Sequence, residues 1–178
     1  MTSKQGVSAK ELQRQLKVSY TTAWTWLHKV RFCISALPKI ELEGEIEIDE
    51  TYVGGHAPDA QGRCTDFKSV VTCAVEKRGR GCGRAWLGLV ENASGKELSS
   101  FVKQSAADGA TIHTDAWRGN SALHRSGYRH IATCVNASGN EAHESLPRVH
   151  RIFSLVKRWL MGTHQGSVSK KHLQAYPP

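Results

Sequence analysis

The sequence predicts a mixed α/β fold in which a small helical segment precedes one sheet-based domain. Three consecutive strand patterns follow the helical segment, and strands then alternate with helices towards the C-terminus. Strands joined by turns form a meander, whereas strands separated by helices pair within a sheet that the helices cover. We therefore expect a helical segment over residues 1–38 and a single mixed α+β domain over residues 39–178.

Residues 7–31 have the pattern of two short helices joined by a tight turn. Ser8 and Glu11 have the spacing of a capping box, and residues 17–19 interrupt the apolar stripe that follows. The second helix ends in basic residues, which is typical of a helix-turn-helix that contacts DNA. A packing hairpin with Trp24 in its core would give the same pattern, so this segment leaves both interpretations open.

The run GEIEIDETYVGG, residues 44–55, predicts the central strand. Its β-branched and aromatic residues alternate with polar ones, and a glycine pair ends it. Ile46, Ile48 and Tyr52 share one face, and the opposite face carries Glu45, Glu47, Asp49 and Thr51. Carboxylates that are lined up in this way repel one another unless they are solvated or share a cation. A solvated strand face and a metal ligand at Asp49 are both consistent with this stretch.

The remaining pattern predicts a sheet completed by later strands and covered by two helices. Residues 32–43 form a connector and residues 77–83 a basic hairpin turn. Further strands are expected over residues 67–76, 84–91, 111–115 and 128–135, with helices over 94–107 and 146–161, a short helix between the last two strands, and polar loops over 54–66 and 136–145. Ligands in such sheets collect at strand ends.

Charge and cysteine content narrow the class of protein. Lys and Arg number 24 against 16 Asp and Glu, a net charge of +8, which favours a polyanion such as nucleic acid as partner. The five Cys form no C-x-x-C pair, which disfavours a disulfide framework and a zinc ribbon. Neither a signal peptide nor an apolar run of membrane-spanning length occurs, so we expect a cytoplasmic, nucleoid-associated protein with no membrane partner.

The last predicted helix presents two separate faces. An apolar face consists of Val149, Ile152, Phe153, Val156, Trp159 and Leu160. His150, Ser154 and Lys157 form a polar ridge beside it, at spacings of four and three. Arg148, Arg151 and Arg158 add the positive charge that phosphate contacts require.

Asp115 follows a short strand and precedes a turn-rich run. An Asp in this position commonly caps a helix, and it is also a usual place for a metal ligand. Two carboxylates at neighbouring strand ends, with a third ligand on a helix, form a two-metal site for phosphodiester chemistry. Asp49, Asp115 and His150 meet that description.

Three ordered motifs carry a resemblance to a known family. They are EIEIDETYVGG, HTDAWRGN and VHRIFSLVKRWLMGTHQGSVSKKHLQAY. The chain resembles bacterial insertion-sequence transposases of the DDE type with an ISXO-like catalytic domain. The resemblance implies a ribonuclease H-like fold and the cleavage and joining of DNA with two divalent ions, Mg²⁺ or Mn²⁺. It also implies that the partners are insertion-sequence ends and target DNA, with a homo-oligomer forming on the DNA.

The resemblance assigns the catalytic positions. Asp49 is the first acid, Asp115 the second, and His150 occupies the third, metal-binding position, with Lys157 seven residues further on. Many DDE enzymes have Glu where this chain has His150, and a neutral imidazole binds Mg²⁺ less well than a carboxylate. Glu144 is the alternative third acid, but the residue seven positions beyond it is Arg rather than Lys.

The resemblance and the basic charge together predict where DNA is contacted. The expected residues are Thr21, Thr22, Lys29 and Arg31 on the second helix and Arg151, Lys157 and Arg158 on the last. The zinc ribbon and the Arg-rich tail that the family usually carries are not found in this sequence, so we expect a shortened copy, truncated at the C-terminus. A catalytically inactive remnant that only binds DNA is the alternative function, and a non-transposase nuclease of the same fold is a third.

Overall fold

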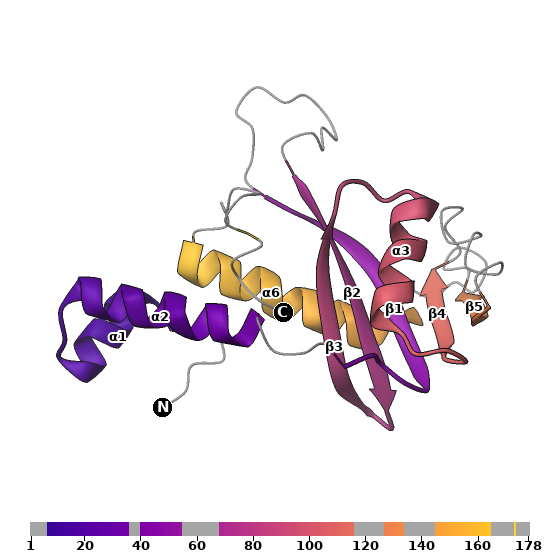
Figure 1. Cartoon of the computed structure of the whole chain (residues 1–178), viewed down its shortest axis with the longest axis horizontal. Helices are drawn as coiled ribbons and strands as arrows, with labels where there is room; N and C mark the ends of the chain where they lie inside the picture. Colours follow the sequence, from indigo (N-terminus) through magenta and orange to yellow (C-terminus); the bar gives the residue numbers. More distant parts are fainter. Residues whose placement is uncertain are drawn as a thin grey trace.

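The structure is a computed structural model (Figure 1), and it describes residues 7–35, 40–54, 68–115, 127–133, 145–164 and 173. Its elements are α1 (Ala9–Leu16), α2 (Tyr20–Ser35), β1 (Glu45–Val53), β2 (Ser69–Arg78), β3 (Gly81–Val90), α3 (Gly95–Ser105), β4 (Thr111–Asp115), β5 (Arg129–Thr133) and α6 (Pro147–His164). The polar loops and the short helix predicted between β4 and β5 lie almost entirely outside the described residues.

Side-chain caps define the two N-terminal helices. The Ser8 Oγ accepts a hydrogen bond from the Glu11 N–H at 3.1 Å, as the capping-box spacing predicts. Lys17 ends α1 in the left-handed conformation, with φ of 54°. Ser19 then caps α2 by accepting from the Thr22 N–H at 3.1 Å. The connector predicted from residue 32 was placed too early, because α2 continues to Ser35 with no helix breaker in its last turn.

The sheet has five strands in the order β3-β2-β1-β4-β5. β2 is antiparallel to both β1 and β3, whereas β1, β4 and β5 are mutually parallel. This order confirms the predicted mixed sheet and is that of the ribonuclease H-like fold. The β2–β3 turn is tighter than the predicted run 77–83, because Arg78 already pairs with Gly81 and leaves only Gly79 and Arg80 in the turn.

Helices cover both faces of the sheet, as Figure 1 shows for α3 and α6. On one face, Ile46 and Ile48 of β1 pack in a buried cluster with Phe101 of α3. On the other face, Cys73 of β2 packs with Phe153 of α6 in a second cluster. Side chains alternate along a strand, so odd-numbered residues of β1 point towards α6.

The α1–α2 pair lies to one side of the sheet (Figure 1). It exposes a set of large apolar side chains: Leu16, Tyr20, Trp24, Trp26, Val30, Phe32 and Ile34. Trp24 is 47% exposed and stacks on His28 with ring centroids 4.0 Å apart. The packing-hairpin interpretation, which placed Trp24 and Leu27 in the core, is therefore wrong for Trp24, whereas Leu27 is half-buried. Within those residues, no helix has both the length and the apolar character needed to span a membrane.

Candidate active site

Asp49 and Asp115 lie side by side on neighbouring strands. β1 and β4 pair in parallel with Glu47 opposite His113. Asp49 and Asp115 each come two residues after this last pair, so the register continued along both strands brings them close together, and the charge of Asp115 acts on Asp49. Residues opposite each other in a sheet point to the same face, which for Asp49 is the face that α6 covers. The parallel strands thus bring two carboxylates that are far apart in the sequence into the same neighbourhood.

Electrostatic coupling agrees with this geometry. Burial is the main cause that raises the pKa of Asp49 from 3.8 to about 6, and the charge of Asp115 acts in the same direction. The Glu50 N–H, which donates to Asp49 Oδ1 at 2.9 Å, lowers the pKa, and so does the charge of Lys157. Asp49 is therefore a mostly buried carboxylate that carries an energetic cost when ionised and lies within the influence of an acid and a cation.

Glu50 is a member of this acidic group that sequence reasoning missed. Burial, followed by the charges of Asp49 and Asp115, raises the pKa of Glu50 to about 7. Strand alternation assigns Glu50 to the face opposite Asp49, and for that reason its sequence position gave no signal. Glu50 is half-buried and lies close enough to both acids for their charges to act on it.

His150 lies next to Asp49, as its predicted role requires. The His150 Nε2 is 3.5 Å from Asp49 Oδ2, and the His150 ring meets Phe153 edge-on with centroids 6.3 Å apart. Ser154, the next residue of the predicted ridge, donates from its Oγ to the His150 carbonyl at 2.9 Å and so serves its own helix. The structure therefore brings Asp49, Asp115, His150 and Lys157 together, whereas the alternative third acid lies outside the described residues.

The acids and His150 form a set of candidate donors for a divalent cation. Among the described residues, no three His, Cys, Asp or Glu side chains already converge tightly enough to hold a metal ion. The chemistry of the set nevertheless fits one, because desolvated carboxylates that raise one another's pKa are relieved by a shared hard cation. Asp49 and Asp115 would hold the ion, and His150 is positioned to complete the set.

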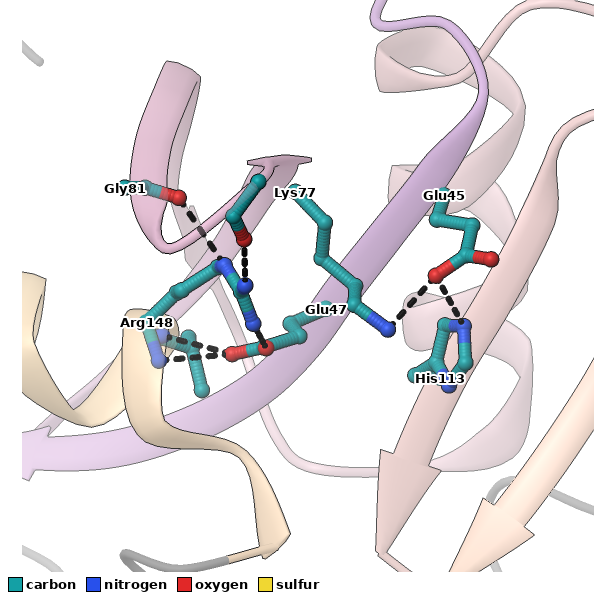
Figure 2. Close-up of polar contacts among 8 residues, drawn as sticks. Glu45, Glu47, Lys77, Gly81, His113 and Arg148 are labelled. Carbon is teal, nitrogen blue, oxygen red and sulfur yellow. Dashed lines mark hydrogen bonds and ion pairs between the residues drawn. The ribbon is translucent and has the colours of Figure 1, made fainter.

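The two other acids on the same face of β1 have separate partners (Figure 2). Glu45 forms an ion pair with Lys77 and lies 3.4 Å from His113 Nε2, and Lys77 is the main cause of the lowered pKa of Glu45. Glu47 is only 2% exposed and pairs with Arg148 at 2.8 Å. The interpretation of this face as solvated is therefore wrong for Glu47. Arg148 is likewise not the free phosphate-binding charge that the sequence suggested.

The predicted DNA-contact residues divide between α2 and α6. Thr21 and Lys29 of α2 are exposed, and so are Arg151, Lys157 and Arg158 of α6. Thr22 is half-buried, and its hydroxyl shares a hydrogen bond with the Ser19 hydroxyl at 2.8 Å. The Arg31 guanidinium lies over the Trp159 ring, 6.0 Å from the centroid, and so links the two helices. That these residues contact DNA is still a prediction from the sequence.

The fold and the paired acids define the class of protein, which is a DDE-type transposase domain. The profile of the ISXO2-like transposase domain family matches residues 41–177, and the chain belongs to this family. This finding confirms the family that the three sequence motifs indicated. A comparison with curated proteins gave no match.

Two solved structures of Mos1 assemblies are similar to the chain. One is the crystal structure of a pre-cleavage Mos1 transpososome, with a TM-score of 0.41 and 10% identity over 95% of this chain and 65% of that chain. The other is the crystal structure of the Mos1 strand transfer complex, with a TM-score of 0.38 and 11% identity over 95% of this chain and 64% of that chain. The present chain therefore spans just under two thirds of the length of each Mos1 chain.

Proposed function

We propose that the chain catalyses metal-dependent cleavage and strand transfer of insertion-sequence DNA. Membership of the ISXO2-like family supports the class of reaction. The observation that carries the proposal is the parallel pairing of β1 with β4, which ends at Glu47 and His113 and leaves Asp49 and Asp115 two residues further along neighbouring strands, where their charges interact. His150 and the charge of Lys157 meet the same carboxylate there.

Each of these residues has a distinct role in the proposed reaction. Asp49 and Asp115 hold the divalent ions, and His150 contributes its imidazole to the same site. Two Mg²⁺ or Mn²⁺ ions supply electrostatic stabilisation of the attacking and leaving oxygens of a phosphodiester. Lys157 contacts a DNA phosphate beside the acids. The raised pKa values of Asp49 and Glu50 mean that a bound divalent cation would stabilise their ionised forms.

DNA is the proposed partner along two basic helices. Thr21 and Lys29 on α2 would contact one part of the DNA, and Arg151 and Arg158 on α6 would contact phosphates near the acids. The element ends and the target are two separate DNA segments, so we propose that a homo-oligomer assembles when the protein binds them.

A strand-transfer assay tests the proposed function. Wild-type protein is incubated with labelled terminal-repeat DNA and Mn²⁺, alongside Asp49→Asn and Glu45→Gln. Removing a metal ligand is expected to lower activity at least about 100-fold, since even outer-shell changes at metal sites cost about 10- to 100-fold. Glu45→Gln, a control on the same strand face, should retain most of the activity. Equal activity of wild type and Asp49→Asn would disprove the assignment.

A DNA-binding remnant without catalysis is the second candidate function. It is favoured by an imidazole in the place of an acid, and by the lack of three converged metal donors among the residues described. This function predicts DNA binding that weakens steeply with salt and no nicking by any divalent ion. Metal-dependent nicking that Asp115→Ala abolishes would exclude it.

A further inference from the structure

Arg148 connects three segments around the start of α6 (Figure 2). Its guanidinium pairs with Glu47 Oε1 of β1 through NH1 at 2.8 Å. It also donates to two carbonyls at the β2–β3 turn, to that of Gly81 at the start of β3 from Nε at 2.9 Å and to that of Gly79 in the turn from NH2. One planar side chain thus joins β1, the β2–β3 turn and α6 through a fixed fork of donors that a lysine lacks.

Glu47 completes this clamp from the strand side. Its second oxygen, Oε2, accepts from the backbone N–H of Arg148 at 2.7 Å and from that of Val149 at 3.1 Å. The first N–H groups of a helix have no partner within it, and a carboxylate there also meets the positive end of the helix dipole. The buried Glu47 therefore caps α6 and fixes where the helix begins on β1.

The clamp, which consists of Glu47 and Arg148, lies next to the candidate active site on both β1 and α6. Asp49 comes two residues after Glu47 on the same face of β1, and His150 comes two residues after Arg148 on α6. The structure contains both contacts, from Glu47 to Arg148 and from Asp49 to His150. A rotation or a shift of the first turn of α6 would therefore carry His150 away from Asp49.

We propose that Arg148 is a positioning residue that holds His150 against Asp49 by clamping α6 to Glu47 and to the β2–β3 turn. The inference rests on the proposed function for its catalytic meaning. A general stabilising role is the competing explanation, and the chain provides a matched pair for comparison. Arg84 donates from Nε and NH2 to Glu76 Oε1, and Glu76 is as buried as Glu47, but this pair joins β2 to β3 rather than to α6.

The test uses metal-free NMR of the histidine rings in the full chain. The His150 resonances are assigned by His150→Gln, and Asp49→Asn shows where they move when the contact with Asp49 is lost. Arg148→Lys keeps the charge and removes the planar fork, and Glu47→Gln perturbs the clamp from its other side. Arg84→Lys is the control, and thermal unfolding verifies that every variant is folded.

We expect Arg148→Lys and Glu47→Gln to move the His150 resonances towards their Asp49→Asn positions, while Arg84→Lys leaves them in place. The dissociation constant for Mn²⁺ should rise about 10-fold in Arg148→Lys, as for other residues that orient ligands, and by less than about twofold in Arg84→Lys. Unmoved His150 resonances in Arg148→Lys, or equal movement in Arg84→Lys, would overturn the positioning role. If Mn²⁺ leaves the His150 resonances of the wild type unchanged, the proposed metal function is refuted. The positioning role of Arg148 is tested separately, by the spectra recorded without metal.

Discussion

Replacing Asp49 with Asn should make the protein more stable at neutral pH while removing its proposed metal chemistry. Burial and Asp115 raise the pKa of Asp49 from 3.8 to about 6. Each pKa unit corresponds to about 1.4 kcal/mol, so the ionised carboxylate costs the native state about 3 kcal/mol relative to the unfolded chain. Asparagine has nearly the same shape and no charge, and it removes this cost.

The sign of the effect depends on pH. Because the pKa of Asp49 is higher in the native state, the folded protein binds more protons than the unfolded chain between the two values. The stability of the wild type relative to Asp49→Asn should therefore fall as pH rises from about 4 to about 6, and then level off. The two proteins should become equally stable only well below about pH 4, where Asp49 is protonated in both states.

Urea unfolding at about pH 4 and about pH 8 measures the difference in unfolding free energy between wild type and Asp49→Asn. Glu11→Gln on exposed α1 controls for the change in net charge and should alter stability by no more than about 1 kcal/mol. Adding Mn²⁺ at about 100 times its dissociation constant should stabilise the wild type by about 2.7 kcal/mol and leave Asp49→Asn unchanged. A wild type that is as stable as Asp49→Asn at about pH 8 would refute the reasoning, since Asp49 would then bear no cost of ionisation.

Three further predictions concern the fold and the DNA surface. Gly88→Ala should destabilise the protein by about 1–3 kcal/mol, because a Cβ there would lie 2.7 Å from the Phe101 ring. At Gly81 the nearest atom to a new Cβ is 3.5 Å away, so Gly81→Ala should cost less than about 1 kcal/mol. Urea unfolding compares the two variants, and equal losses of stability would contradict the packing argument. Ser94→Ala should cost about 1 kcal/mol, since Ser94 caps α3, and unchanged unfolding would show that the cap is dispensable. If Lys29 contacts a phosphate, Lys29→Ala should reduce the slope of log affinity against log salt by about 1 in a DNA titration, and an unchanged slope would remove Lys29 from the DNA surface.

Local signals predicted most of the secondary structure, and the arrangement of the site came from the family resemblance. The capping serines, the alternation along β1 and the apolar face of α6 all act within a few residues, so pattern alone locates these elements. The pairing of Asp49 with Asp115 depends on β1 lying beside β4 rather than beside β3. Sequence periodicity carries no information about that choice, whereas the motif order of a known family does.

The roles of the other acids on β1 could not be predicted from the sequence. Glu45, Glu47 and Asp49 occupy equivalent positions in the alternation, but each meets a different neighbour. Glu47 is buried because the first turn of α6 lies on it, and Glu45 is exposed because it sits near the start of the strand. Tertiary contacts from distant segments, rather than strand period, thus decide which carboxylate is a cap and which is available to a cation.

The parallel pairing of β1 with β4 also determines when the acidic pair can form. β1, β2 and β3 follow one another along the chain and pair with their sequence neighbours, so their meander has short loops to close. Glu45 must instead find Thr111, beyond the whole meander and α3, before Asp115 reaches Asp49. A chain emerging from the ribosome can fold the meander while β4 is still unsynthesised. The two acids can therefore come together only after β4 has been synthesised, later than the meander that carries Asp49.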